Sequence, residues 1–354
     1  MKIKPHLKHL YRTGADEKKR TGYLRLDMNE AVSGLPESFV KEALSGITAE
    51  TLAAYPSYKD LEEKIALHSD LSPENICLSN GSDAAIKYIF DAYVTAGDKV
   101  LLADPTFAMY PVYCGMFNAE KIMVEYNPDF TFPSDDFIKQ IVPGVKLAVL
   151  VNPNNPTGTF IERDILLSVI KKAENNNTII IIDEAYFYFY PDSVIKYVET
   201  FKNLIVLRTF SKLCAMAAAR LGYAAACPEI VKNLKTVKPT YDVNGFAVFL
   251  GEKILDDVNV IKTLILSAEE GKRYLSHKLS KAGIEHREGC ANFTLIKTRE
   301  RTSEIMERLA GENILVNGRF KQPFLQDYIR VTSGDKKAMK QFWDEFIRIW
   351  RSDI

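Results

Sequence analysis

Between about residues 76 and 245, two patterns of apolar residues alternate along the chain. Short runs rich in Val, Ile and Leu alternate with stretches that repeat at helical spacing. This alternation is typical of a parallel sheet covered by helices on both faces. The predicted strands are residues 76–78, 99–103, 119–124, 147–151, 178–183, 204–209 and 223–226, and the predicted helices between them include 84–96 and 163–174.

The last hundred residues have a different pattern. A long helical stretch over 243–282 precedes short predicted strands at 292–297 and 328–332, which alternate with predicted helices at 303–310 and 336–349. This order indicates a smaller α+β module. No Pro/Gly/Ser-rich linker separates the two parts, so we expect closely packed domains joined by one continuous helix near residues 245–282.

Composition narrows the class of function. The 354 residues are 47% apolar, and 46 Lys and Arg balance 46 Asp and Glu, so no global field favours nucleic acid or an anionic membrane. The five cysteines are scattered and never spaced as Cys-x-x-Cys, which argues against a disulfide framework or a metal site. With no signal-peptide pattern and no run of ~18 apolar residues, we expect a cytoplasmic enzyme acting on small molecules.

A lysine with candidate chemistry follows one predicted strand. Lys212 comes just after the strand 204–209, at the edge where open α/β sheets bind ligands. Burial there would lower the pKa of the amine and free the nucleophile that a Schiff base needs. A solvated surface lysine is the alternative. The hydroxyls of Thr209 and Ser211, with Arg220 nearby, could bind a phosphate group.

Asp183 closes the apolar strand 178–183. A carboxylate at this edge could keep a pyridinium nitrogen protonated, which makes pyridoxal-5′-phosphate (PLP) an electron sink. The alternatives are a helix cap or a magnesium ligand, as in a nucleotide hydrolase. However, the chain has no Gly-x-x-x-x-Gly-Lys-Ser/Thr phosphate loop. Tyr186, three residues later, could donate a hydrogen bond to the phenolic oxygen of such a cofactor.

Asn155 lies in the turn 152–158, where prolines and a glycine fix the backbone. Its amide could also donate to a phenolic oxygen, although a plain loop explains the composition equally well. In the strand-end stretch 328–332, Arg330 is a guanidinium in a β-like segment. Its bidentate geometry suits a substrate carboxylate, and a structural salt bridge is the alternative.

Gly81, Ser82 and Asp83 stand between the first predicted strand and its helix. Backbone N–H groups at a helix N-terminus form an anion site, but Ser82 or Asp83 could equally be an N-cap. Further along, Phe107 and Tyr110 offer aromatic faces on which a pyridine ring could stack. Packing in the core is the alternative for both rings.

In this order, these segments resemble the fold-type I PLP enzymes, and most closely the histidinol-phosphate aminotransferase family. The resemblance covers nearly the whole chain through residues 26–30, 54–56, 80–83, 154–158, 183–186, 211–212, 220–223 and Arg330. It implies the aspartate-aminotransferase fold, with a large PLP-binding domain over 45–245 and a small domain from 1–44 and 246–354. The large domain should hold a mostly parallel seven-stranded sheet, and the enzyme should be a homodimer.

The resemblance also implies roles for single residues. Lys212 would form the Schiff base and shuttle a proton, Asp183 would hold the pyridinium, and Asn155 and Tyr186 would contact the phenolic oxygen. Arg330 would bind the substrate carboxylate. The implied phosphate-binding positions are Gly81, Ser82, Asp83, Thr209, Ser211 and Arg220, with Phe107 stacking on the ring and Tyr55 reaching the phosphate from the partner subunit.

One position departs from the family pattern. Family members that act on histidinol phosphate carry an arginine where this chain has Asn317, and Arg319 stands slightly later. The resemblance therefore implies an aminotransferase acting on an amino acid and a small keto or phosphorylated acceptor, with Arg319 as a candidate phosphate contact. A PLP-dependent decarboxylase of a phosphorylated hydroxy-amino acid is the alternative, because both reactions use Lys212 and Asp183 in the same way. A PLP-binding regulator lacks support, since no DNA-binding domain is attached.

Overall fold

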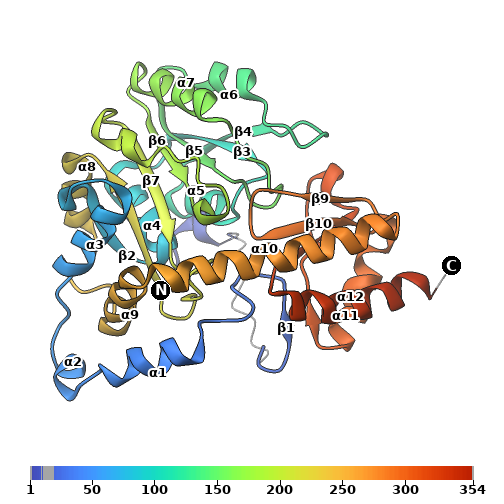
Figure 1. The fold of residues 1–354 in the computed structure, drawn as a ribbon. Coiled ribbons are helices and arrows are strands. Elements are labelled where there is room, and N and C mark those ends of the chain that lie inside the picture. Colours follow the sequence, from blue (N-terminus) through green and yellow to red (C-terminus); the bar gives the residue numbers. More distant parts are fainter. Residues whose placement is uncertain (1, 9, 11–19, 353–354) are drawn as a thin grey trace.

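A seven-stranded sheet forms the centre of the larger part of the molecule (Figure 1). The computed structural model describes residues 2–8, 10 and 20–352. The strand order is β2-β8-β7-β6-β5-β3-β4, and β8 runs antiparallel to the other six strands. The mostly parallel seven-stranded sheet predicted from the sequence is thus confirmed. Its strands are β2 (Ile76–Asn80), β3 (Lys99–Asp104), β4 (Glu120–Glu125), β5 (Val145–Val151), β6 (Ile179–Asp183), β7 (Leu204–Thr209) and β8 (Leu221–Ala226).

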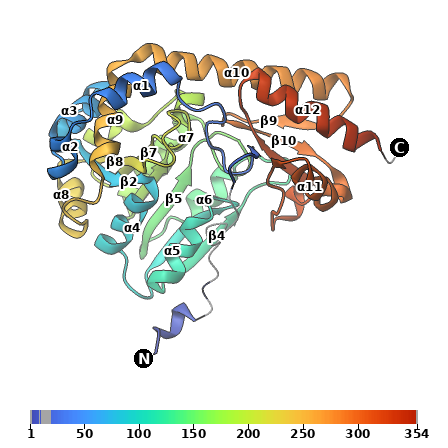
Figure 2. The same cartoon turned by 90° about the horizontal axis from the view of Figure 1, so that it is seen from below.

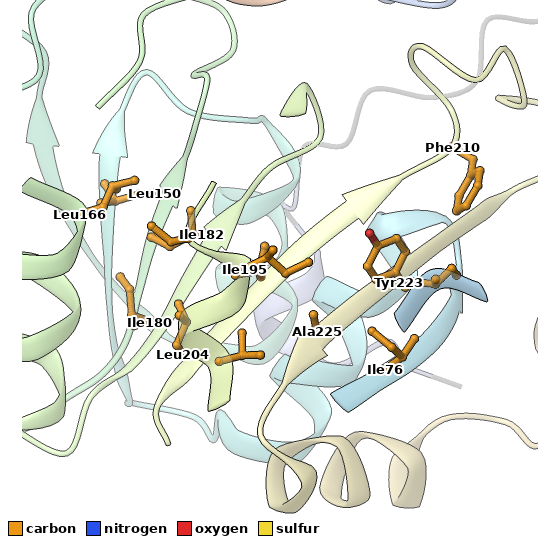
Figure 3. Packing of buried hydrophobic residues seen from close by; sticks show 14 of the residues in the cluster. Ile76, Leu150, Leu166, Ile180, Ile182, Ile195, Leu204, Phe210, Tyr223 and Ala225 are labelled. Carbon is orange, nitrogen blue, oxygen red and sulfur yellow. The ribbon is translucent and has the colours of Figure 1, made fainter. Parts of the chain in front are cut away.

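Helices cover both faces of this sheet because its central strands are apolar on both sides. Along β6, Ile180 and Ile182 pack into one core cluster and Ile181 into the other. Figure 3 shows the first cluster, in which Ile182 lies near Leu150 and Leu204 near Ile180. The helices on that face are α3 (Lys59–Ser69), α6 (Ser134–Gln140), α7 (Arg163–Glu174) and α9 (Gly245–Asp256); those on the other are α4 (Gly81–Tyr93), α5 (Met109–Phe117) and α8 (Pro228–Val237).

The C-terminal module packs its own core beside the large sheet. Its antiparallel sheet has the order β12-β10-β9, and β1 pairs in parallel with β11. These strands are β1 (Leu24–Arg25), β9 (His286–Glu288), β10 (Phe293–Lys297), β11 (Ile314–Leu315) and β12 (Tyr328–Thr332). They are accompanied by α11 (Thr302–Gly311) and α12 (Lys336–Arg351), while α10 (Val258–Lys281) runs between the two parts (Figures 1 and 2).

The prediction of one continuous helix over 245–282 is wrong. The chain forms α9 and α10 with a break at Asp257, whose backbone has φ −111° and ψ 82°. The Asp257 carboxylate accepts hydrogen bonds from the backbone N–H groups of Asn259 and Val260 at 3.0 and 3.3 Å. The Asp257 side chain thus caps the first N–H groups of α10, so a new helix begins there and α9 ends.

Smaller elements complete the described chain. The short helices α1 (Glu37–Ser45) and α2 (Ala49–Ala53) lead into the large part, and the 3-10 turns are η1 (Pro5–Leu7), η2 (Pro73–Asn75), η3 (Phe187–Phe189), η4 (Ile195–Glu199), η5 (Arg299–Arg301) and η6 (Pro323–Leu325). Near η1, a ring nitrogen of His6 lies 3.2 Å from the Met116 carbonyl oxygen, at the end of α5. All five cysteines are unpaired. Within residues 2–8, 10 and 20–352, no helix is long and apolar enough to span a bilayer.

Candidate active site

The polar residues singled out in the sequence gather where β5, β6 and β7 end. These three strands are parallel neighbours in the sheet, so their carboxyl ends share one edge. The turn holding Asn155 follows β5, Asp183 is the last residue of β6, and Lys212 lies three residues past β7. Adjacent parallel strands therefore bring together side chains that are far apart along the chain.

Lys212 lies in an environment that favours a neutral amine. Its Nζ donates a hydrogen bond to the carbonyl oxygen of Met28 at 3.0 Å and lies 5.9 Å from the centre of the Tyr186 ring. Burial, and next the positive charge of Arg330, lower the pKa of Lys212 to about 8. A larger fraction of this amine than of an ordinary lysine is therefore unprotonated and nucleophilic near neutral pH.

Asp183 is a buried carboxylate with only 2% of its surface exposed. Tyr110 donates a hydrogen bond to its Oδ2 at 2.8 Å, and the backbone N–H of Ala185 donates to its Oδ1 at 3.1 Å. Burial raises the pKa of Asp183 to about 6, against the opposing effect of the Tyr110 hydrogen bond. No side chain in the described ranges forms an ion pair with it, so a cationic ligand here would stabilise the ionised carboxylate.

Arg330 and Tyr186 complete the polar cluster. Arg330, 6% exposed on β12, donates to the Asn155 side-chain oxygen and to the backbone carbonyl of Asp27. Its Nε is buried without a hydrogen-bond partner, which leaves a donor for an incoming carboxylate. Tyr186 accepts a hydrogen bond from the Asn29 amide at 2.8 Å, and burial raises its pKa to about 12.

The predicted phosphate-binding residues come from three segments that meet beside β8. A Cβ on Gly81, which has φ +74°, would lie 2.6 Å from a guanidinium nitrogen of Arg220, and one on Gly222 would lie 2.5 Å from the backbone nitrogen of Ser82. These close approaches show that the start of α4 and the 220–222 segment are packed together. The hydroxyl of Thr209 donates to that of Ser211 at 2.9 Å.

The start of α4 also shows whether Ser82 or Asp83 is the N-cap of this helix. Asn80 occupies the N-cap position and makes no side-chain capping bond, so Ser82 and Asp83 lie within the first turn. The alternative interpretation, that Ser82 or Asp83 is the N-cap, is therefore wrong. Tyr113 donates to the Asp83 carboxylate at 3.1 Å, which ties this turn to α5.

Three other predicted site residues are partly or fully exposed. Phe107 packs edge-on against Tyr110 with ring centres 6.2 Å apart. Tyr55 is 78% exposed and stacks on Tyr241 at 4.3 Å. Arg319 is exposed, and its backbone N–H donates to the Asn317 side-chain oxygen at 3.3 Å.

Sequence reasoning missed the hydrogen bonds that two residues make within the cluster. Tyr110 was considered for stacking, whereas the structure shows it as the hydrogen-bond donor to Asp183. Asn29 lies in the motif 26–30 and donates a hydrogen bond to Tyr186. Backbone carbonyls of the same segment accept hydrogen bonds from Lys212 and Arg330. The match of residues 26–30 to the family pattern was the sequence signal that could have identified Asn29 as a site residue. Over the ranges that the structure describes, no group of three or more His, Cys, Asp or Glu side chains could hold a metal ion.

Relatives of known family match nearly the whole chain. The family model described as aminotransferase class I and II matches residues 21–346. A histidinol-phosphate aminotransferase from Thermoanaerobacter sp. (strain X514) is 35% identical over 318 residues, which are 89% of both chains. The enzyme of the same name from Clostridium novyi (strain NT) is 32% identical over 318 residues, 89% of this chain and 88% of that one. None of these relatives supports the decarboxylase alternative.

Solved structures confirm the fold. Histidinol-phosphate aminotransferase from Sinorhizobium meliloti, solved in complex with pyridoxal-5′-phosphate, has a TM-score of 0.89 at 21% identity and covers 99% of this chain and 98% of its own. Aspartate aminotransferase from Thermus thermophilus with maleate has a TM-score of 0.77 at 21% identity and covers 92% and 91%. The predicted aspartate-aminotransferase-like architecture is thus confirmed. From the family match and these relatives, the chain belongs to the aminotransferase class I and II family and is a PLP-dependent aminotransferase.

Proposed function

We propose that this enzyme transfers an amino group between an amino acid and a small keto or phosphorylated acceptor at the Lys212–Asp183–Arg330 cluster. One observation carries the proposal: a lysine with a lowered pKa, a buried carboxylate without a cationic partner, and an arginine with an unpaired Nε converge at one sheet edge. A cofactor or substrate of opposite charge would pair with Asp183 and Arg330, and Lys212 offers an amine for covalent attachment.

The residues present fit PLP. A cation would stabilise the ionised form of the buried Asp183 carboxylate, and the protonated ring nitrogen of PLP is one. Lys212 offers an amine that can hold the cofactor covalently. When bound, PLP supplies an electron sink for the bonds at the substrate Cα. Asp183 then keeps the ring nitrogen protonated, and the Lys212 amine removes and returns the proton at the substrate Cα.

Asn155, Tyr186 and Arg330 would orient the bound molecules. Because the Asn155 side-chain oxygen accepts from Arg330, its NH₂ group is the end left to donate to the cofactor's phenolic oxygen. Tyr186 is held by Asn29 and can donate its hydroxyl proton to the same oxygen. Arg330 would receive the substrate carboxylate through the donor that it leaves unpaired.

Gly81, Ser82, Asp83, Thr209, Ser211 and Arg220 would hold the cofactor phosphate. The close packing of α4 on the 220–222 segment and the hydroxyl pair of Thr209 and Ser211 support this assignment. Phe107 would stack on the cofactor ring. We also propose a cytoplasmic homodimer in which the exposed Tyr55 reaches the partner's phosphate, and a PLP-binding domain over 45–245 beside a small domain from 1–44 and 246–354. The pairing of β1 with β11 supports this division, although η1 packs on α5.

Absorbance of the purified holoenzyme after addition of single amino acids tests the reaction. Conversion of the cofactor to its amino form, reversed by a keto acid, is the expected result. Release of an amine product and carbon dioxide without that conversion would overturn the proposal. Repeating the titration with Arg330→Lys tests the carboxylate contact, because a lysine keeps the charge but loses the bidentate fork. We expect KM for the amino acid to rise by about ten- to a hundredfold.

A further inference from the structure

A buried ion pair lies directly behind the candidate active site. Glu184 follows Asp183 in the chain, and Arg208 precedes Thr209. Alternation along β6 and β7 sends Ile182 and Val206 into one core cluster, and Ile181 and Leu207 into the other. Glu184 and Arg208 therefore lie on the face opposite to Asp183 and Thr209.

The two side chains form a saturated network. The Nε and Nη2 atoms of Arg208 donate to Glu184 Oε2 at 3.0 and 2.9 Å, and the side chains are only 6% and 3% exposed. Glu184 Oε1 accepts from the Val194 N–H at 2.9 Å, and Ser193 Oγ contacts both the carboxylate and Arg208. Every oxygen of the carboxylate is thereby satisfied without solvent.

The same network reaches the turn that carries Tyr186. The Arg208 guanidinium lies 3.8 Å from the centre of the Phe187 ring, and Phe187 is the next residue after Tyr186. The ladder between β6 and β7 ends at the pair Asp183 and Leu207, where Glu184 N–H still donates to the Leu207 carbonyl at 2.8 Å. The ion pair therefore joins the two strands at the point where their regular pairing stops.

Stability alone does not account for such a pair. Removing two charges from water costs several kcal/mol per ion, and apolar replacements of buried pairs are often neutral or stabilising. The Glu184–Arg208 pair differs from an apolar contact in being directional, because its hydrogen bonds fix both backbones relative to each other. The residues immediately beside it, Asp183 and Thr209, are those that face the site.

We propose that Glu184 and Arg208 are positioning residues that fix Asp183, Tyr186 and the Lys212 segment relative to one another. This inference rests on the proposed function of those three residues. The pair touches neither the substrate nor the cofactor. It acts through the ends of β6 and β7 and through the ring of Phe187.

The double variant Glu184→Leu/Arg208→Met tests the proposal in the holoenzyme. We expect kcat to fall by about ten- to a hundredfold per PLP-loaded site, because small displacements of reacting groups cost rates of this order. The midpoint of the pH titration of the cofactor absorbance should shift as well, since it reports the surroundings of Lys212. Arg208→Lys, which keeps the charge but has a single donor nitrogen, should show only part of both effects.

Val206→Ala is the matched control. Val206 is fully buried on the same face of the same strand, two residues before Arg208, so its truncation should lower the melting temperature without moving kcat or the titration midpoint. Unchanged kcat and midpoint in the folded double variant would overturn the inference. If the double variant does not fold, Ser193→Ala serves instead, because it removes one bridging hydroxyl; unchanged values there would also overturn it.

Borohydride trapping of the wild-type enzyme separates the two proposals. Label on Lys212, combined with unaltered kinetics in the variants, would overturn the positioning role alone. Label on a different lysine would overturn the proposed site and the positioning role together.

Discussion

Asp183→Asn should reduce kcat by about three powers of ten while leaving the fold intact. The carboxylate is 2% exposed and accepts from Tyr110 and from the Ala185 backbone at 2.8 and 3.1 Å. An asparagine keeps the size and can still accept through its oxygen, so little destabilisation is expected. What disappears is the negative charge that would hold the cofactor's ring nitrogen protonated.

The magnitude follows from the charge pair. Two unit charges about 4 Å apart attract by about 4 kcal/mol at an effective dielectric constant of ~20. The raised pKa of Asp183, about 6, shows that burial already weakens the ionised form when no cation is present. At about 1.4 kcal/mol per factor of ten, losing the attraction corresponds to about three powers of ten in rate.

Steady-state rates with saturating PLP and amino donor measure this effect, with thermal unfolding as the check on folding. Tyr110→Phe is the matched comparison, because it removes one hydrogen bond to Asp183 but keeps the charge. A hydrogen bond to a charged group contributes about 1.5–3 kcal/mol, so this variant should lose only about one to two powers of ten. Near-native kcat in Asp183→Asn would refute the reasoning and return Asp183 to a structural role.

Three further predictions test the rest of the site. Lys212→Ala should abolish turnover, and borohydride should no longer fix PLP to the protein, because the labelled peptide in the wild type is expected to contain Lys212. The rate at which the apoenzyme takes up PLP covalently should rise with pH with a midpoint at about 8, as Lys212 loses its proton; a pH-independent rate would contradict the amine assignment. Mixing Tyr55→Ala with Lys212→Ala chains should restore activity if Tyr55 serves the partner's site, and no recovery despite measured subunit exchange would contradict it.

The sheet could be predicted from the sequence because its signal is local. The strands of the large part appear within one or two residues of their predicted bounds, since each is a run of apolar residues between polar turns. The start of β8 was placed two residues late, at 223. Leu221 and Gly222 belong to it, and glycine is a poor strand former. The helix break at Asp257 was missed because a capping side chain interrupts an otherwise continuous apolar pattern.

The contacts within the site depend on residues far apart in the chain. Asp183 is recognisable as the end of an apolar strand, but nothing near it in the sequence indicates that Tyr110, 73 residues earlier, donates to it. The same applies to Asn29 and Tyr186, which are 157 residues apart. The pairing of Glu184 with Arg208 depends on the register of two strands, which periodicity alone does not supply.

The substrate end of the site differs in origin from the cofactor end. Lys212, Asp183 and Asn155 follow neighbouring parallel strands, so their convergence is a consequence of the sheet. Arg330 instead donates to the backbone carbonyl of Asp27 in the N-terminal segment. The backbone of Arg330 also forms an antiparallel bridge with that of Asn317, which lies in the loop after β11. A change at Asn317 therefore alters the surroundings of Arg330, the residue proposed to bind the substrate carboxylate. Because a missing charge-assisted phosphate contact costs about 1.5–3 kcal/mol, histidinol phosphate should be turned over poorly compared with glutamate, which needs no phosphate contact. Efficient turnover of histidinol phosphate that is lost in Arg319→Ala would show instead that Arg319 supplies this contact from two residues further along.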